Sequence, residues 1–378
     1  MYKRISGRWK CILKVLYLLN HAGKAGTERY VYSLVEKLNG KKIKAYFAYN
    51  EEGLLVERLK AIGVETFQIR MLNPFDIKAI RKLSSICKKL KIDVIHTQFL
   101  RENYIAILSR LFNPRVSVIY TNHFVIPNNR VQKIFNKVLT SFNAYIIAVC
   151  NKGREMLISN GNNASIIKVI PNGVDASYWG EPCESAMRSE FGIGKEEFVI
   201  LCASRFAHDK GHGFLIESLS ELKKMTIVKF KCVLAGDGPL LPAVKKQVCG
   251  LGLDNEIIFA GFREDIKNLF YGSDLYVNSS EHEALSFLIL EALASGLPVI
   301  ATDMGGNRDI INNETGCGML VEYGNSREMA GAILKVMEDR ALRQNLSENA
   351  FKTVKERFNL DKVAENTYNL YMDSIKKV

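Results

Sequence analysis

The stretch DLYVNSSEHEALSFLILEALASGLPVIA, residues 274–301, contains a strand, a helix and a second strand, and it indicates the fold of the chain. The run Asp274 to Ser279 predicts a buried strand, residues 284–295 predict a helix, and Pro298 to Ala301 predict the next strand. A helix between two buried strands is typical of the crossover that joins parallel neighbours. The stretch therefore predicts a parallel sheet covered by helices.

The same alternation extends along nearly the whole chain. Predicted strands of the first half are Cys11 to Leu19, Ile43 to Tyr49, Val64 to Ile69, Asp93 to Gln98, Ser117 to His123, Ala144 to Cys150 and Ile166 to Ile170. Those of the second half are Phe198 to Ala203, Lys229 to Ala235, Glu256 to Ala260, Asp274 to Ser279, Pro298 to Ala301 and Gly318 to Val321. An irregular segment, 174–194, separates the two series, and residues 340–376 have only helical pattern. We expect two doubly wound α/β domains with a boundary near residues 172–195.

Ligands of open parallel sheets bind at the carboxyl ends of the strands, so the polar residues that follow strands are the candidates for a site. Arg205 and Lys210 follow the strand that ends at Ala203. The planar donor fork of arginine and the mobile charge of lysine together suit two phosphates of one ligand. The alternative is that both are solvated loop cations.

Two glutamates belong to the opening stretch. Glu283 and Glu291 are eight positions apart, so on one helix they point to a similar side. Glu291 lies within an apolar run, where a carboxylate needs a partner. That partner is either a ligand hydroxyl or a structural arginine.

The first half offers weaker signals. A loop from Gly23 to Glu28 follows the first strand and opens a helix, and the backbone amides around Gly26 could face an anion, although any strand-to-helix turn can need glycine. His123 ends a predicted strand, and His96 ends the strand before it. A lone histidine is as often structural as functional.

Charge divides the chain into unlike halves. The net charge of +12 is the sum of +18 over residues 1–175, from 29 basic and 11 acidic side chains, and −6 over the remainder. A basic half suggests a nucleic acid, an anionic membrane face or a phosphorylated acceptor as partner, and an uneven spread of surface lysines is the alternative. The eight cysteines are dispersed, without metal-ligand spacing, which favours a reducing cytosol.

Several function classes lack their required residues. We find no Walker loop, no Gly-x-Gly-x-x-Gly fingerprint, no nucleophile elbow and no Asp-x-Asp pair for Mg²⁺. His208 and His212 have metal-like spacing but no third ligand nearby, so zinc is not expected. The basic and apolar start of the chain resembles a secretory signal, but Lys14 interrupts it and a buried strand is the favoured interpretation. No uncharged run is long enough to span a membrane.

Four motifs, in order and spacing, resemble the retaining glycosyltransferases of family 4, which have the GT-B fold. They are VIPNGVD (169–175), ASRFAHDKGH (203–212), LAGDGP (234–239) and the block from Ser279 to Ile300. Two positions depart from the family pattern, Ala25 before Gly26 and Ala284 after Glu283. The resemblance covers nearly the whole chain and implies two tandem Rossmann-like domains facing an interdomain cleft. Residues 1–175 would bind the acceptor, 176–358 the nucleotide sugar, and 359–378 would pack back on the first domain.

The resemblance also implies roles for single residues. The residues that it assigns to donor binding are Gly26, Arg205, Lys210, Phe262, Arg263, Glu283, Leu285, Ser286 and Glu291. The residues that it assigns to the reaction are Arg205, Lys210, Glu283 and His123. No cofactor and no metal is expected, because fixed cations and helix-end amides would stabilise the departing diphosphate.

The expected activity is transfer of a sugar, with retention, from a nucleoside-diphosphate sugar to a hydroxyl of a glycan or of a lipid-phosphate acceptor. UDP is the expected carrier and GDP-mannose the second choice, in cell-envelope or surface polysaccharide biosynthesis. A non-catalytic nucleotide-sugar sensor or subunit is the alternative. Nucleic acid is not expected as a partner, because no recognisable module for it is present. We expect a cytoplasmic protein whose basic first domain either docks on the inner face of the cytoplasmic membrane or binds a lipid-phosphate acceptor.

Overall fold

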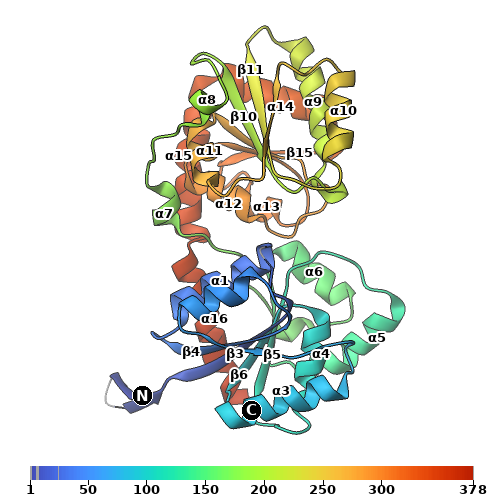
Figure 1. Cartoon of the computed structure of the whole chain (residues 1–378), viewed down its shortest axis with the longest axis vertical. Coiled ribbons are helices and arrows are strands. Elements are labelled where there is room, and N and C mark those ends of the chain that lie inside the picture. The colour runs from blue at the N-terminus through green and yellow to red at the C-terminus, as the bar shows by residue number, and fades with distance from the viewer. Residues whose placement is uncertain (1, 6–7, 24, 378) are drawn as a thin grey trace. The chain divides into compact units, whose positions relative to one another are not determined.

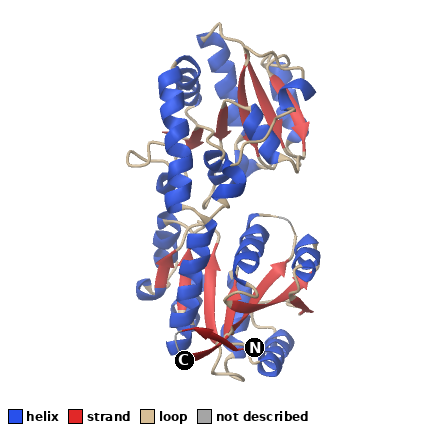
Figure 2. Cartoon of the chain, turned by 90° about the vertical axis from the view of Figure 1, so that its left-hand side faces the viewer, coloured by secondary structure: helices blue, strands red, loops and turns tan. Residues whose placement is uncertain are grey.

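Two parallel sheets organise the chain, one of seven strands and one of six. The structure is a computed structural model that describes residues 2–5, 8–23 and 25–377. It divides into a first unit, Met1–Asn172 with Leu360–Val378, and a second unit, Gly173–Asn359 (Figure 1). In each unit helices cover both faces of the sheet (Figure 2). The expected pair of Rossmann-like α/β domains is thus confirmed.

The seven-stranded sheet of the first unit has the order β5-β4-β3-β6-β7-β8-β9, with every pair parallel. The central strand β3 is almost wholly buried because helices lie against both of its faces, which explains its continuous apolar run. Strand order reverses between β3 and β6, so the loops after these strands flank the point where doubly wound sheets bind ligands.

The elements of the first unit, in chain order, are β1 (Tyr2–Ile5), β2 (Arg8–Cys11), β3 (Leu13–His21), α1 (Gly26–Leu38), β4 (Ile43–Glu51), α2 (Leu54–Ala61), β5 (Glu65–Gln68), α3 (Ile77–Leu90), β6 (Val94–Thr97), α4 (Leu100–Ser109), β7 (Ser117–Asn122), α5 (Arg130–Leu139), η1 (Thr140–Phe142), β8 (Tyr145–Ala148), α6 (Asn151–Ser159), η2 (Ala164–Ile166), β9 (Ile167–Val169), α16 (Leu360–Ser374) and η4 (Ile375–Lys377). The last two come from the end of the chain, and α16 packs against α1 and β7.

The six-stranded sheet of the second unit has the order β12-β11-β10-β13-β14-β15, again parallel throughout. Its order reverses between β10 and β13. The loops after these two strands therefore lie side by side, and they contain the two richest motifs of the sequence.

The elements of the second unit are α7 (Ala176–Gly180), α8 (Met187–Glu190), β10 (Phe198–Ala203), η3 (His208–Lys210), α9 (His212–Met225), β11 (Phe230–Ala235), α10 (Leu241–Gly250), β12 (Ile257–Gly261), α11 (Ile266–Gly272), β13 (Leu275–Asn278), α12 (Phe287–Ala294), β14 (Val299–Thr302), α13 (Asn307–Ile310), β15 (Gly318–Val321), α14 (Ser326–Glu338) and α15 (Arg340–Arg357).

Three details differ from expectation. The helix predicted over 284–295 begins only at Phe287, because Ser286 caps it by accepting a hydrogen bond from the amide of Ile289. The segment 174–194 contains the short helices α7 and α8, and Asp175 caps the first of them. Before the predicted first strand, β1 and β2 form an antiparallel pair.

In the part of the chain that the structure describes, we find no helix with the length and apolar character that a bilayer crossing requires.

Candidate functional site

The loop after β10 carries Arg205 and Lys210 and packs against the end of β13. Gly211, which follows the short helix η3, has φ +63°, and a Cβ there would lie 2.0 Å from the carbonyl oxygen of Ser279. The Ser279 hydroxyl in turn donates a hydrogen bond to the carbonyl of Lys210 at 2.9 Å. Glycine thus allows the close approach of the two loops that places Lys210 beside the residues after β13.

Lys210 lies between two carboxylates. Its Nζ is 3.0 Å from Oε2 of Glu283 and 3.4 Å from Oδ2 of Asp209. The other oxygen of Asp209 lies 3.8 Å from Nη2 of Arg205. The structure therefore brings together Arg205, Lys210 and Glu283, three residues that the sequence assigned to the reaction, and adds Asp209.

Electrostatics hold Lys210 in its charged form. Burial of Lys210 opposes the ammonium, but the charges and hydrogen bonds of Glu283 and Asp209 outweigh burial, so the pKa of Lys210 lies above its ordinary value. Two cations and two carboxylates make the cluster neutral as a whole. Lys210 is mostly buried, whereas Arg205 is largely exposed, so the two cations differ in freedom to move.

Glu283 does not share a helix with Glu291, which corrects the expectation that two helical turns align them. Glu283 belongs to the loop between β13 and α12, and Gly305 fixes that loop: at φ +54°, a Cβ on Gly305 would lie 1.6 Å from the Glu283 carbonyl oxygen. The amide of Gly306 also donates to the carbonyl of Ala284 at 2.7 Å. The position of Glu283 thus depends on a contact made by the segment after β14.

Three more predicted donor-binding residues lie in or just before α12. Glu291 is fully buried within the helix, and Leu285 and Ser286 are buried at its start. They share the carboxyl-end edge of the sheet with Glu283 because α12 begins where the loop after β13 ends. Their roles toward a donor remain predictions.

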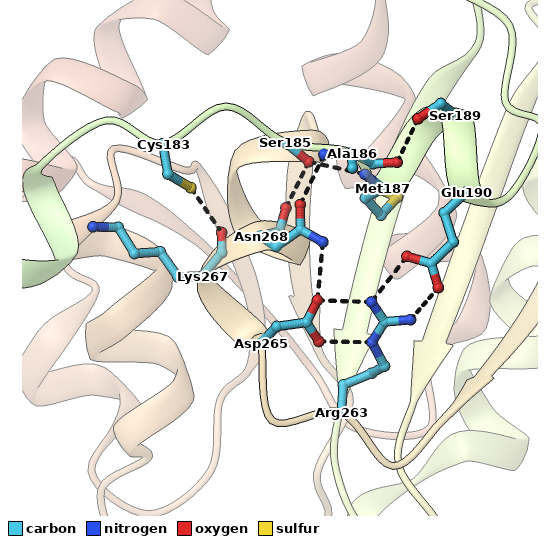
Figure 3. Close-up of polar contacts among 10 residues, drawn as sticks. All are labelled: Cys183, Ser185, Ala186, Met187, Ser189, Glu190, Arg263, Asp265, Lys267 and Asn268. Atoms are coloured by element: carbon cyan, nitrogen blue, oxygen red, sulfur yellow. Dashed lines mark hydrogen bonds and ion pairs between the residues drawn. The ribbon is translucent and has the colours of Figure 1, made fainter.

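Arg263 lies after β12, and its guanidinium is held by two acidic residues. Nε and Nη2 donate to the two oxygens of Asp265, each at 2.7 Å, and Nη2 and Nη1 donate to the carboxylate of Glu190 (Figure 3). These hydrogen bonds raise the pKa of Arg263 and lower those of Asp265 and Glu190. Asn268 extends the network to the amide of Ala186 at 3.0 Å.

This arrangement gives Arg263 a structural role that the sequence did not suggest, because it fastens the segment before β10 to the loop after β12. Phe262, its neighbour, is exposed on the surface. Both residues lie at the carboxyl-end edge of the sheet, two strands away from β10. Base binding by Phe262 and Arg263 remains a prediction.

In the first unit, His123 directly follows β7 and is held on two sides. Its Nε2 lies 2.9 Å from Oε1 of Gln98, and its ring packs edge-on against Tyr30, with centroids 4.9 Å apart. Burial lowers the pKa of His123 to about 3, so the imidazole is neutral near pH 7. Gln98, buried at the end of β6, is a contact of His123 that the sequence did not single out.

The other first-unit candidates differ in character. Gly26 begins α1 and is exposed, and Glu28 secures the preceding loop by accepting from the amide of Gly23 at 3.2 Å, whereas Lys24 lies outside the described residues. His96 is a structural residue: its two ring nitrogens contact the Tyr371 hydroxyl at 2.6 Å and the Thr121 hydroxyl at 2.7 Å. Among the described residues, no group of three or more acidic, histidine or cysteine side chains could hold a metal ion.

Asp209 is the main residue of the cluster that sequence reasoning missed. It stands four positions after Arg205 and next to Lys210, a spacing that could have signalled a carboxylate shared between two cations. Its backbone carbonyl also accepts from the amides of Glu281 and His282, at 3.0 and 3.3 Å. Asp209 therefore joins the two loops through both its side chain and its main chain.

Two family models match the chain, and together they span most of it. The model described as Glycosyltransferase Family 4 matches residues 25–178, and the model described as Glycosyl transferases group 1 matches residues 184–353. The first match ends at residue 178 and the second begins at residue 184, shortly after the second unit begins at Gly173.

Curated relatives are distant but cover most of the chain. A Bacillus anthracis N-acetyl-alpha-D-glucosaminyl L-malate synthase is 23% identical over 328 residues, 83% of this chain and 84% of that protein. An Escherichia coli enzyme named UDP-Gal:alpha-D-GlcNAc-diphosphoundecaprenol alpha-1,3-galactosyltransferase is 26% identical over 312 residues, 79% of this chain and 80% of that protein.

Solved structures agree in fold. A glycosyltransferase from Rickettsia africae superposes with a TM-score of 0.87 at 24% identity, covering 97% of this chain and 99% of that chain. Anabaena HepE, solved in complex with UDP, gives a TM-score of 0.84 at 22% identity, covering 94% and 99%. At these identities the likeness shows the shared GT-B architecture.

Proposed function

We propose that this chain, a member of the group 1 glycosyltransferases with a first unit of the family 4 type, transfers a sugar from a UDP-sugar, with retention and without a metal, to a hydroxyl of a glycan or lipid-linked acceptor. It acts in polysaccharide or glycoconjugate biosynthesis. The observation that carries the proposal is the cluster of Arg205, Asp209, Lys210 and Glu283 at the carboxyl ends of β10 and β13.

A diphosphate can compete with the carboxylates for the two cations of this cluster. Lys210 and Arg205 pair with two carboxylates in the structure. A diphosphate would replace Glu283 as the partner of Lys210. Glu283 would then be free to accept hydrogen bonds from hydroxyls of the sugar. The side chains of Arg205 and Lys210 would then stabilise the negative charge that builds on the leaving phosphate. In other transferases a divalent metal ion has this role.

The proposed step balances without a protein nucleophile. The bond from the anomeric carbon to the diphosphate oxygen breaks, the acceptor oxygen bonds to the same face of that carbon, and the acceptor proton passes to the departing diphosphate. For His123 we propose a hydrogen bond with the sugar as neutral imidazole, which accords with its low pKa. GDP-mannose is the second choice of donor.

The support from relatives concerns the chemical class of both substrates. The E. coli relative is named for a UDP-galactose donor and a diphosphoundecaprenol-linked acceptor, and a Campylobacter jejuni relative, 25% identical over 297 residues, is named for a diphospho-undecaprenol acceptor. Anabaena HepE was solved with UDP. These names favour UDP as the carrier and a polyprenyl-diphosphate glycan as the acceptor.

A panel of nucleotide sugars tests the donor. A donor at 100 times its dissociation constant raises the free energy of unfolding by about 2.7 kcal/mol, which a thermal shift resolves. We expect UDP-sugars to stabilise the chain and Lys210→Ala to abolish the shift, whereas Lys224→Ala, on the surface of the same unit, keeps it. Stabilisation by GDP-mannose alone would contradict the choice of UDP.

The product tests the reaction. NMR of the transferred sugar should show the anomeric configuration of the donor, and the rate should be the same with and without EDTA. An inverted product would overturn retention, and loss of activity in EDTA that Mg²⁺ restores would overturn metal independence.

A further inference from the structure

The helix α5 has its apolar face turned away from the protein. The one residue of this helix that is buried is polar: Asn136 accepts a hydrogen bond from the Tyr104 hydroxyl at 2.7 Å and donates to the carbonyl of Asn160 at 2.8 Å. A surface helix normally packs its apolar residues inward and exposes its polar ones. In α5 most apolar side chains are instead exposed, apart from Leu139, which packs against the core, and Figure 1 shows the helix at the edge of the first unit.

The outward face consists of aliphatic and aromatic side chains at helical spacing. Val131, Ile134 and Val138 are 61%, 67% and 56% exposed. Phe135 is exposed beside them and contacts the exposed ring of Phe75, with centroids 5.5 Å apart. Phe142, in the helical turn η1 that continues α5, is exposed as well. We call Val131, Ile134, Phe135, Val138 and Phe142 the apolar face of α5.

The helix is well formed despite this exposure. Asn129 and Gln132 make a reciprocal capping box at its start, in which each side chain accepts from the backbone amide of the other. Asn136 fixes the rotation of the helix, because turning the apolar face inward would break both of its hydrogen bonds. The structure therefore holds the apolar face outward.

Charge indicates what covers this face. Residues 103–154 contain no aspartate or glutamate, and they contain seven basic side chains: Arg110, Arg115, Arg130, Lys133, Lys137, Lys152 and Arg154. Three of the seven belong to α5 itself. An exposed apolar face on a helix that itself carries lysine and arginine but no acidic residue is the pattern of a helix that lies in the interface of a membrane with anionic lipids.

We propose that the apolar face of α5 docks the first unit on an anionic membrane, with Val131, Ile134 and Val138 inserted among the lipid headgroups and Lys133 and Lys137 facing lipid phosphates. This docking goes beyond the proposed reaction and needs neither donor nor acceptor. It would bring a soluble domain to an acceptor that is confined to the bilayer.

Vesicle sedimentation of the full chain tests the docking in the absence of any sugar nucleotide. We expect binding to vesicles of phosphatidylcholine mixed with phosphatidylglycerol, weaker binding to phosphatidylcholine alone, and loss of binding as salt increases. The double variant Ile134→Asp, Val138→Asp should lower the partition coefficient by at least about tenfold, because two apolar side chains no longer leave water. Lys133→Ala with Lys137→Ala should lower it by about tenfold, mainly at low salt.

Ile227→Asp is the matched control, since Ile227 is a fully exposed aliphatic residue of the second unit. It should bind vesicles like the unaltered chain, and all variants should keep the thermal shift with UDP. Failure of the unaltered chain to bind anionic vesicles, or equal binding by the double variant and the control, would overturn the proposal. So would a dimer in light scattering that the double variant abolishes, because the face would then bind a second copy.

Discussion

At the scale of single residues, Lys210 has the sharpest expected role. Its ammonium is the most enclosed cation of the cluster and contacts both carboxylates, which hold it in position. We predict that Lys210→Ala lowers kcat by about two to three orders of magnitude, the usual effect of removing one preorganised electrostatic group. Steady-state kinetics with the accepted donor measure this change. Lys224→Ala is the control, and a near-normal kcat for Lys210→Ala would remove the residue from the proposed reaction.

A second residue-scale prediction concerns Glu102, a fully buried glutamate of α4. Burial raises its pKa to about 7, while backbone hydrogen bonds and Arg101 oppose this. The folded state therefore holds a proton that the unfolded state releases near pH 4.5, so this group lowers stability as pH rises from about 4.5 to 7.

Glu102→Gln should remove this pH dependence. Between pH 5 and pH 8 the unaltered chain should lose on the order of 2 kcal/mol in the free energy of unfolding through Glu102. The variant should not lose this contribution, because glutamine is neutral at both pH values. Urea unfolding at the two pH values measures it. The exposed Glu155→Gln should show no such difference, and an equal effect of both variants would contradict the assignment.

At the scale of elements, the strands were predicted nearly to their ends and the loops were not. Strands such as β10 and β13 are apolar runs between polar turns, so their burial can be read from the sequence. The predicted start of α12, residue 284, was wrong. Ser286 caps the helix, and the residues before it form a loop that is held by the segment after β14. For the same reason the sequence suggested Arg205, Lys210 and Glu283 but not the contacts of Arg205 and Lys210 with Asp209.

Helix α5 shows the opposite limit. The apolar pattern of a surface helix normally indicates which face is buried, namely the apolar one. For α5 that inference gives the wrong face. The hydrogen bonds of Asn136 with Tyr104 and Asn160, together with the packing of Leu139 against the core, fix the orientation. A polar residue with two long-range partners thus overrides the pattern of four apolar ones.

The loop that carries Glu283 yields an element-scale prediction. Gly305→Ala would place a Cβ against the Glu283 carbonyl, whereas Gly324 has a comparable positive φ, +88°, with no atom within 4 Å of an added Cβ. Gly324→Ala should cost about 1 kcal/mol of backbone strain. Gly305→Ala should cost roughly 3 kcal/mol or displace the loop, and raise the KM for the donor. Equal losses of stability and unchanged kinetics in both variants would show that the contact does not position Glu283.

At the scale of the whole molecule, the charge excess belongs to the first unit and acquires a location there. The acid-free stretch 103–154 borders the apolar face of α5, while the cations of the second unit are paired with carboxylates at the candidate donor site. Under the two proposals the units would therefore meet anions in different ways: the first unit through the basic residues of α5, and the second through a neutral cluster of two cations and two carboxylates.

The end of the chain, Leu360–Val378, belongs to the first unit. Removing the Tyr371 hydroxyl tests how much the buried hydrogen bonds of α16 contribute to the stability of that unit. Tyr371 of α16 lies within hydrogen-bond distance of His96, at 2.6 Å, and of the Tyr17 hydroxyl, at 3.2 Å, in a fully buried group. Tyr371→Phe would leave a buried ring nitrogen of His96 without its partner, so the first unit should lose about 1 to 3 kcal/mol of stability. Urea unfolding measures the loss.

Tyr368→Phe, on the same helix but partly exposed over Lys42, should change stability by less than about 0.5 kcal/mol. Because burial lowers the pKa of His96 to about 3, its neutral ring stabilises the fold above about pH 6.5, and that contribution falls as pH drops toward 3 while the unfolded chain takes up the proton. The loss in Tyr371→Phe should therefore be present at pH 8. Equal stability of the two tyrosine variants there would mean that apolar packing of α16, without the buried hydrogen bonds, fastens the end of the chain to the first unit.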